Sequence, residues 1–133
     1  MLKGFPNQLN NLAKLSRALA VIARLEDAGA NVRDDAVLGE ALVRDGVLGP
    51  RDNTESVEAY LIRYLAQPAS NRPYQTSARG LREMFRYAGC LAEDPDANEA
   101  WLTPLGRQLA THTNDPPTPP EKAAWRVAVA SIR

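Results

Sequence analysis

Three arginines spaced three and four residues apart stand in the stretch YQTSARGLREMFRYAGCL, which runs from Tyr74 to Leu91. They are Arg79, Arg82 and Arg86. On a helix this spacing places them along one side, roughly opposite the apolar residues of the same stretch. Such a side can be an ordinary solvated surface. It can also bind the phosphates and base edges of nucleic acid through its guanidinium groups.

Other residue types offer little for catalysis. His112 ends a predicted helix, where a histidine usually interacts with free carbonyl groups. Cys90 has no second cysteine beside it and the chain has one histidine, so a zinc site lacks ligands. Acidic pairs occur at a helix start and in a turn, where carboxylates act locally. We therefore expect no catalytic set, no metal site and no small-molecule cofactor, and this chain could be the non-catalytic part of a larger enzyme.

The charges fall into blocks, although the chain is neutral with 16 basic and 16 acidic residues. Residues 26–58 carry three basic and nine acidic groups, a net charge of −6, whereas residues 59–92 carry five arginines and one acid, a net charge of +4. A local basic patch can bind phosphates because salt limits electrostatic interactions to about 10 Å. Chance clustering of the arginines is the alternative.

Length and composition indicate a globular protein. The chain has 133 residues, of which 44% are hydrophobic and 24% charged, enough for one domain with its own core. No apolar run approaches the roughly 18–20 residues that cross a bilayer, and the N-terminus lacks the apolar segment of a secretory signal. A single cysteine cannot form an internal disulfide. We expect a cytoplasmic protein without a membrane partner.

Apolar residues at spacings of three and four predict four helices, at residues 8–28, 33–45, 54–67 and 76–88. Two short strands, 90–92 and 100–102, are joined by the acidic turn EDPDANE. Thr103 is predicted to cap a further helix whose first residue is Pro104.

The domain organisation follows from these elements. We expect an N-terminal helical brace at 1–30, a main domain at 31–113, a proline-rich linker at 114–120 and a C-terminal helix at 121–133. The last helix could lead to a further domain, in which case the chain is a fragment of a longer protein.

The order of elements resembles the winged-helix (winged helix-turn-helix) superfamily of DNA-binding domains. The resemblance covers about residues 33–112 and is strongest in GCLAEDPDANEAWLTPLGRQLA. There a glycine ends the recognition helix, a strand with a hydrophobic pair follows, and the second strand runs into Leu102-Thr103-Pro104-Leu105-Gly106-Arg107. The resemblance implies a mainly α fold with a long N-terminal helix, a short two-stranded wing at 90–102 and an additional C-terminal helix. Helix 54–67 would then buttress recognition helix 76–88.

The resemblance also implies which residues contact DNA. Thr76 and Ser77 would offer hydroxyls and backbone N–H groups to a phosphate, Arg79 or Arg82 would bind guanine, and Arg72 would contact a phosphate. The full set of expected DNA contacts is Arg72, Tyr74, Gln75, Thr76, Ser77, Arg79, Arg82 and Arg86. The wing is acidic at Glu93, Asp94, Asp96 and Glu99, which favours a wing that faces solvent or a protein.

Two functions follow. The first is a DNA-binding module whose partner is double-stranded DNA and which could form a homodimer. It would serve as the recognition domain of a longer microbial protein, either a restriction-type or other DNA-processing enzyme or a transcription regulator. The alternative is a protein-interaction or dimerisation module without direct DNA contact. It would use the apolar side of helix 8–28, the acidic wing and a terminal helix bearing Trp125 and Val129, and the −6 block would repel DNA.

Overall fold

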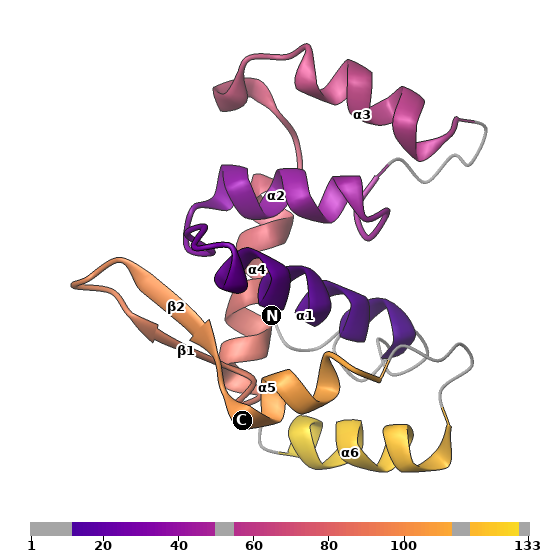
Figure 1. Ribbon diagram of the computed structural model, residues 1–133, viewed down its shortest axis with the longest axis vertical. Helices are drawn as coiled ribbons and strands as arrows, with labels where there is room; N and C mark the ends of the chain where they lie inside the picture. The colour runs from indigo at the N-terminus through magenta and orange to yellow at the C-terminus, as the bar shows by residue number, and fades with distance from the viewer. Residues whose placement is uncertain (1–11, 50–54, 113–117, 131–133) are drawn as a thin grey trace.

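The computed structural model describes residues 12–49, 55–112 and 118–130. Within them the chain is mainly helical and carries one two-stranded antiparallel sheet (Figure 1), so the predicted mainly helical class and the short hairpin are confirmed. The elements in chain order are α1 Leu12–Asp27, α2 Asp35–Arg44, α3 Val57–Leu65, the short 3-10 helix η3 Ala69–Asn71, α4 Gln75–Tyr87, β1 Leu91–Asp94, β2 Glu99–Leu102, α5 Pro104–Leu109 and α6 Pro119–Ala130.

Side-chain caps fix the starts of three helices. The Asp34 carboxylate accepts hydrogen bonds from the N–H groups of the first turn of α2, and the Ser56 hydroxyl does the same for α3. Thr103 caps α5, with Pro104 as its first residue, which confirms the prediction for this helix.

Helix α4 begins without a side-chain cap. Tyr74, the residue before it, adopts the left-handed backbone conformation with φ of 74°. Its carbonyl oxygen accepts a hydrogen bond from Ala78 N at 2.9 Å. The helix therefore starts at Gln75, one residue earlier than predicted, and Thr76 and Ser77 lie in its first turn.

The core forms where α1, α2, α4 and the hairpin meet. Helix α4 packs mainly against α2 and β1, while α1 packs against α2, α5 and β2. The largest fully buried side chains are Trp125, Tyr64, Phe85, Leu19, Ile22, Leu38, Leu42 and Leu109. The buttress of α4 is thus α2, and the expectation that residues 54–67 fill this role is wrong.

Helix α3 lies on the far side of α2 from α1 in Figure 1. One of its side chains, Tyr64, is fully buried, and the Tyr64 hydroxyl donates to Pro73 O at 3.1 Å. Val57, the first residue of α3, is 44% exposed, and Ile62 is 73% exposed. Helix α3 packs against α2 and contributes little apolar surface to the core, so it is not the helix that α4 mainly packs against.

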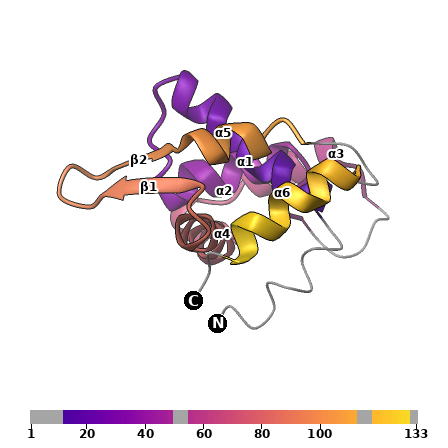
Figure 2. The same ribbon diagram turned by 90° about the horizontal axis from the view of Figure 1, so that it is seen from below.

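Helix α6 packs against α5 at one end of the molecule (Figures 1 and 2). Trp125 is fully buried there, and its indole Nε1 donates to Ser16 Oγ of α1 at 3.1 Å. The expectation that Trp125 forms part of an interaction surface is therefore wrong. The side chain of Val129, residues 1–11 of the predicted brace and most of the predicted linker lie outside the described residues.

Candidate functional site

The β1–β2 hairpin has two different faces. Leu91 pairs with Leu102 and Glu93 with Ala100, and these residues form the inner face toward the helices. The outer face of the hairpin comprises Ala92, Asp94, Glu99 and Trp101. Trp101, on this outer face, is 42% exposed.

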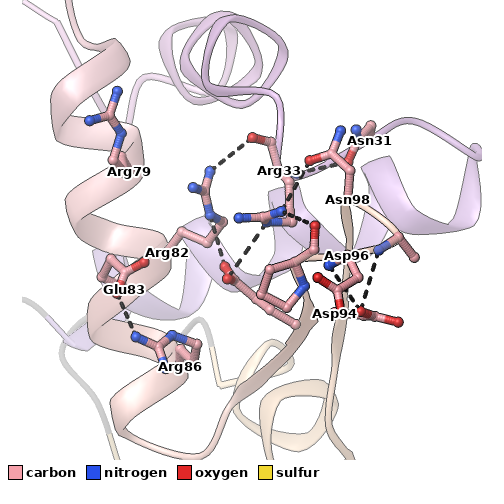
Figure 3. Close-up of polar contacts among 12 residues, drawn as sticks. Asn31, Arg33, Arg79, Arg82, Glu83, Arg86, Asp94, Asp96 and Asn98 are labelled. Carbon is pink, nitrogen blue, oxygen red and sulfur yellow. Dashed lines mark hydrogen bonds and ion pairs between the residues drawn. The ribbon is translucent and has the colours of Figure 1, made fainter.

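Arg82 connects α4, α2 and the inner face of the hairpin. Its side chain is 6% exposed, and Nη1 lies 2.6 Å from Asp35 Oδ1 while Nε lies 3.0 Å from Glu93 Oε1. Nη1 also donates to Arg33 O at 3.2 Å (Figure 3). The expectation that Arg82 faces solvent is wrong, because two carboxylates from other elements replace the water that its guanidinium would lose on burial.

Arg33 holds the turn of the same hairpin. Its Nη1 donates to Asn98 Oδ1 at 3.1 Å and to Pro95 O at 3.4 Å, and its Nε lies 3.6 Å from Glu93 Oε2 (Figure 3). Glu93, predicted to belong to an exposed acidic wing, is instead 7% exposed and paired with two arginines. We name the cluster of Arg33, Asp35, Arg82 and Glu93 the hairpin clamp. Arg82 and Glu93 are its buried members, and Arg33 and Asp35 are partly exposed.

Sequence reasoning did not find the clamp. Its members lie up to 60 residues apart, from Arg33 to Glu93, and no local motif connects them. The spacing of residues in α4 gave one weak indication that Arg82 is buried. Arg82 follows Ala78 by four residues and precedes Phe85 by three, and both of these side chains are fully buried.

Arg79 and Arg86 remain more accessible. The Arg79 side chain is 58% exposed, and its Nε donates to Asp35 Oδ2 at 2.9 Å. The Arg86 side chain is 38% exposed and pairs with Glu83 at 2.7 Å. Exposed ion pairs contribute about 0–1 kcal/mol, so these guanidinium groups can exchange their carboxylates for another anion at little cost.

Asp35 serves both Arg79 and Arg82. Burial acts to raise the pKa of its carboxyl group, but the hydrogen bonds and charges of the two arginines outweigh that effect. The pKa of Asp35 is therefore lowered from its ordinary value of 3.8.

Arg72 holds the loop before α4. Its Nε donates to Gln67 O at 3.0 Å, its Nη2 donates to Leu65 O at 3.2 Å, and its Nη1 lies 3.4 Å from Glu40 Oε1. Gln75 also contacts this loop, through Nε2 to Ala69 O at 2.7 Å. Both side chains thus have structural contacts inside the molecule.

Tyr74 lies beside two other tyrosines at this junction. Its ring centroid is 6.5 Å from that of Tyr60, and the Tyr60 centroid is 6.2 Å from that of Tyr64. Burial, followed by the hydrogen bond with Tyr74, raises the pKa of Tyr60 to about 12. The three rings therefore form an aromatic cluster beside the start of α4.

Three of the described glycines lie inside helices, and packing within the molecule requires glycine at one of them. A Cβ at Gly106 of α5 would collide with Cys90 O, whereas one at Gly39 of α2 would make an ordinary contact, 3.5 Å from Tyr74 O. A Cβ at Gly80 of α4 would meet no described atom within 4 Å. Gly80 belongs to the outer face of α4, which we define as Thr76, Arg79, Gly80, Glu83 and Tyr87.

The described residues contain no group of three or more histidine, cysteine, aspartate or glutamate side chains placed to hold a metal ion. Cys90 is fully buried, and burial raises the pKa of its thiol to about 11. No helix within the described ranges is both long and apolar enough to cross a membrane. Comparisons with family models, with curated proteins and with solved structures found no match to this chain.

Proposed function

We propose that this chain is a winged-helix module that binds double-stranded DNA with the outer face of α4. In this proposal α4 is the recognition helix and the β1–β2 hairpin is the wing. Helix α2 is the supporting helix that packs against α4, although α3 lies between the two in the chain. The packing of α4 against α2 and β1 supports these assignments.

The open space at Gly80 is the observation that carries the proposal. Glycine inside a helix costs about 1 kcal/mol relative to alanine, and here nothing described inside the molecule requires it. A glycine on an exposed helix face lets another backbone approach closely. The major groove of DNA, about 12 Å wide, admits a helix that must come close to base edges and phosphates.

The surrounding side chains suit that approach. Thr76 and Ser77 are exposed in the first turn of α4, where hydroxyls and N–H groups can bind a phosphate. Arg79 is exposed and can exchange Asp35 for a phosphate or a guanine. Arg82, within the hairpin clamp, positions the wing in this proposal and does not read a base.

Titration of a fluorescently labelled random-sequence duplex tests the proposal. We expect binding that weakens steeply as salt rises from about 50 to 200 mM, because bound phosphates release counterions. Arg79→Ala should weaken binding by about tenfold, as expected for loss of one good contact of about 1–3 kcal/mol.

Arg44→Ala is the matched control, since Arg44 on α2 is 53% exposed and is likewise paired with a carboxylate, that of Glu40. This variant should bind DNA as the unaltered chain does. Binding that does not depend on salt, or equal losses in the two variants, would argue against DNA recognition by α4.

A further inference from the structure

The outer face of the hairpin carries an exposed aromatic side chain. Trp101 is 42% exposed, whereas the other tryptophan, Trp125, is fully buried and hydrogen-bonded. No described residue forms a hydrogen bond or a ring contact with the Trp101 indole. A large aromatic ring in this position is typical of protein-binding surfaces, where tryptophan is enriched among the residues that contribute most to affinity.

Two carboxylates lie on the same face of the hairpin as this ring, toward the turn. Asp94 and Glu99 stand directly opposite each other in the strand pairing, and both are exposed. Like charges in directly opposed positions destabilise a sheet. Asp94 also caps the turn by accepting from Asp96 N at 3.1 Å, but within the described residues no basic side chain pairs with either carboxylate.

The inner face shows the opposite arrangement. Glu93 is paired with Arg82 and Arg33, and Leu91 and Leu102 are buried. The clamp therefore holds the hairpin against the helices, while the hairpin projects beyond the helical body in both views (Figures 1 and 2). A surface that is held in place before binding loses less conformational freedom when a partner docks.

We propose that the outer face of the hairpin binds a lysine- or arginine-bearing segment of a partner protein. A cation placed over the Trp101 indole is attracted by the ring, and Asp94 and Glu99 can accept its hydrogen bonds. Phosphates are repelled by the same two carboxylates. The inference does not depend on DNA binding, because it uses a different surface from the outer face of α4.

A labelled deca-lysine peptide is the probe, and its fluorescence anisotropy is measured on the full chain. We expect the peptide to bind and deca-glutamate not to bind. Trp101→Ala should weaken binding of the peptide about fivefold or more, and Glu99→Gln about threefold, in line with exposed cation–π and charge contacts. Circular dichroism checks that each variant is folded, and Glu99→Gln changes no buried group.

Glu58→Gln is the matched control, because Glu58 is an exposed acid on α3, away from the hairpin. It should leave peptide binding unchanged. The proposal is overturned if deca-lysine does not bind at about 50 mM salt, or if Glu58→Gln and Glu99→Gln weaken binding equally. It is also overturned if sedimentation shows self-association that Glu99→Lys abolishes, since a second copy of the chain would then be the occupant.

Discussion

At the residue scale, two arginines one turn apart on α4 share a carboxylate but have different surroundings. Arg82 is 6% exposed and contacts Asp35 and Glu93, whereas Arg79 is 58% exposed and contacts Asp35 alone. Burial decides what each guanidinium can do. The buried guanidinium of Arg82 has fixed carboxylates in place of water, so separating it from them costs free energy. The exposed guanidinium of Arg79 can exchange its carboxylate for water or for another anion at little cost.

Arg82→Ala should lower the free energy of unfolding by about 2–4 kcal/mol, less than the roughly 3–5 kcal/mol of a fully unpaired buried charge, because Arg79 and Arg33 still pair with Asp35 and Glu93. Urea unfolding followed by circular dichroism measures the change. Arg79→Ala, the control on the same helix, should cost at most about 1 kcal/mol. Equal effects of the two substitutions would contradict the structural role of the hairpin clamp.

The lowered pKa of Asp35 predicts a pH dependence of stability. A carboxyl group whose pKa is lower in the folded state stabilises the fold above its unfolded value, here 3.8, and this contribution is lost as the pH falls through the folded pKa. The unaltered chain should therefore exceed Asp35→Asn in stability at neutral pH, and the gap should shrink below about pH 3.8. Urea unfolding from about pH 7 to pH 2.5 measures this gap. A gap independent of pH would show that the Asp35 charge does not stabilise the clamp.

The sequence could not predict these residue-scale roles. Helical periodicity identified the side of α4 on which the arginines lie, but the burial of Arg82 depends on Asp35 and Glu93, which are 47 and 11 residues away. An arginine on a helix gives the same local pattern whether its partner is water or a distant carboxylate.

At the element scale, the glycines of α4 and α5 should respond in opposite ways to alanine. Gly80→Ala should raise the free energy of unfolding by about 0.5–1 kcal/mol, since the added methyl group meets open space and the helix gains propensity. Gly106→Ala should destabilise the fold severely, because its Cβ would collide with Cys90 O. Thermal unfolding of both variants measures the difference. A destabilised Gly80→Ala variant would mean that α4 needs this glycine for its own packing.

The elements themselves were largely predictable. Thr103-Pro104 identified the start of α5, and the glycines after α2 and α4 identified their ends. The left-handed start of α4 at Tyr74 was not predictable, because nothing in a tyrosine favours that conformation. The buttressing role of α2 was also missed, since periodicity shows that a helix has an apolar side without showing which helix packs against it.

At the scale of the whole molecule, Trp125 joins α6 to α1 across 109 residues of sequence through its hydrogen bond to Ser16. Trp125→Phe should cost about 1 kcal/mol or more, because it removes this hydrogen bond and leaves the buried Ser16 hydroxyl without that donor. Trp101→Phe is the matched control and should change stability little, since Trp101 is partly exposed. Chemical unfolding measures the free energy of unfolding of both variants. Equal losses of stability would contradict the anchoring role of Trp125.

No sequence pattern predicted that contact. An amphipathic stretch near the end of the chain is compatible with docking on the same molecule, on a second copy or on another protein. Which of these surfaces the helix docks on depends on the shape of the core, which is formed by residues far apart in the sequence.

Filling the open space at Gly80 with a negative charge shows whether the outer face of α4 binds DNA. Gly80→Glu is compared with Gln108→Glu, which makes the same change of charge at an exposed residue of α5. In Figure 2 that helix lies toward the top and α4 toward the bottom, with α1 and α2 between them. Affinity for a labelled duplex at about 50 mM salt is measured together with thermal stability. We expect both variants to stay folded, Gly80→Glu to lose about tenfold or more in affinity, and Gln108→Glu to bind as the unaltered chain does. Equal affinities of the two folded variants would contradict DNA binding by the outer face of α4.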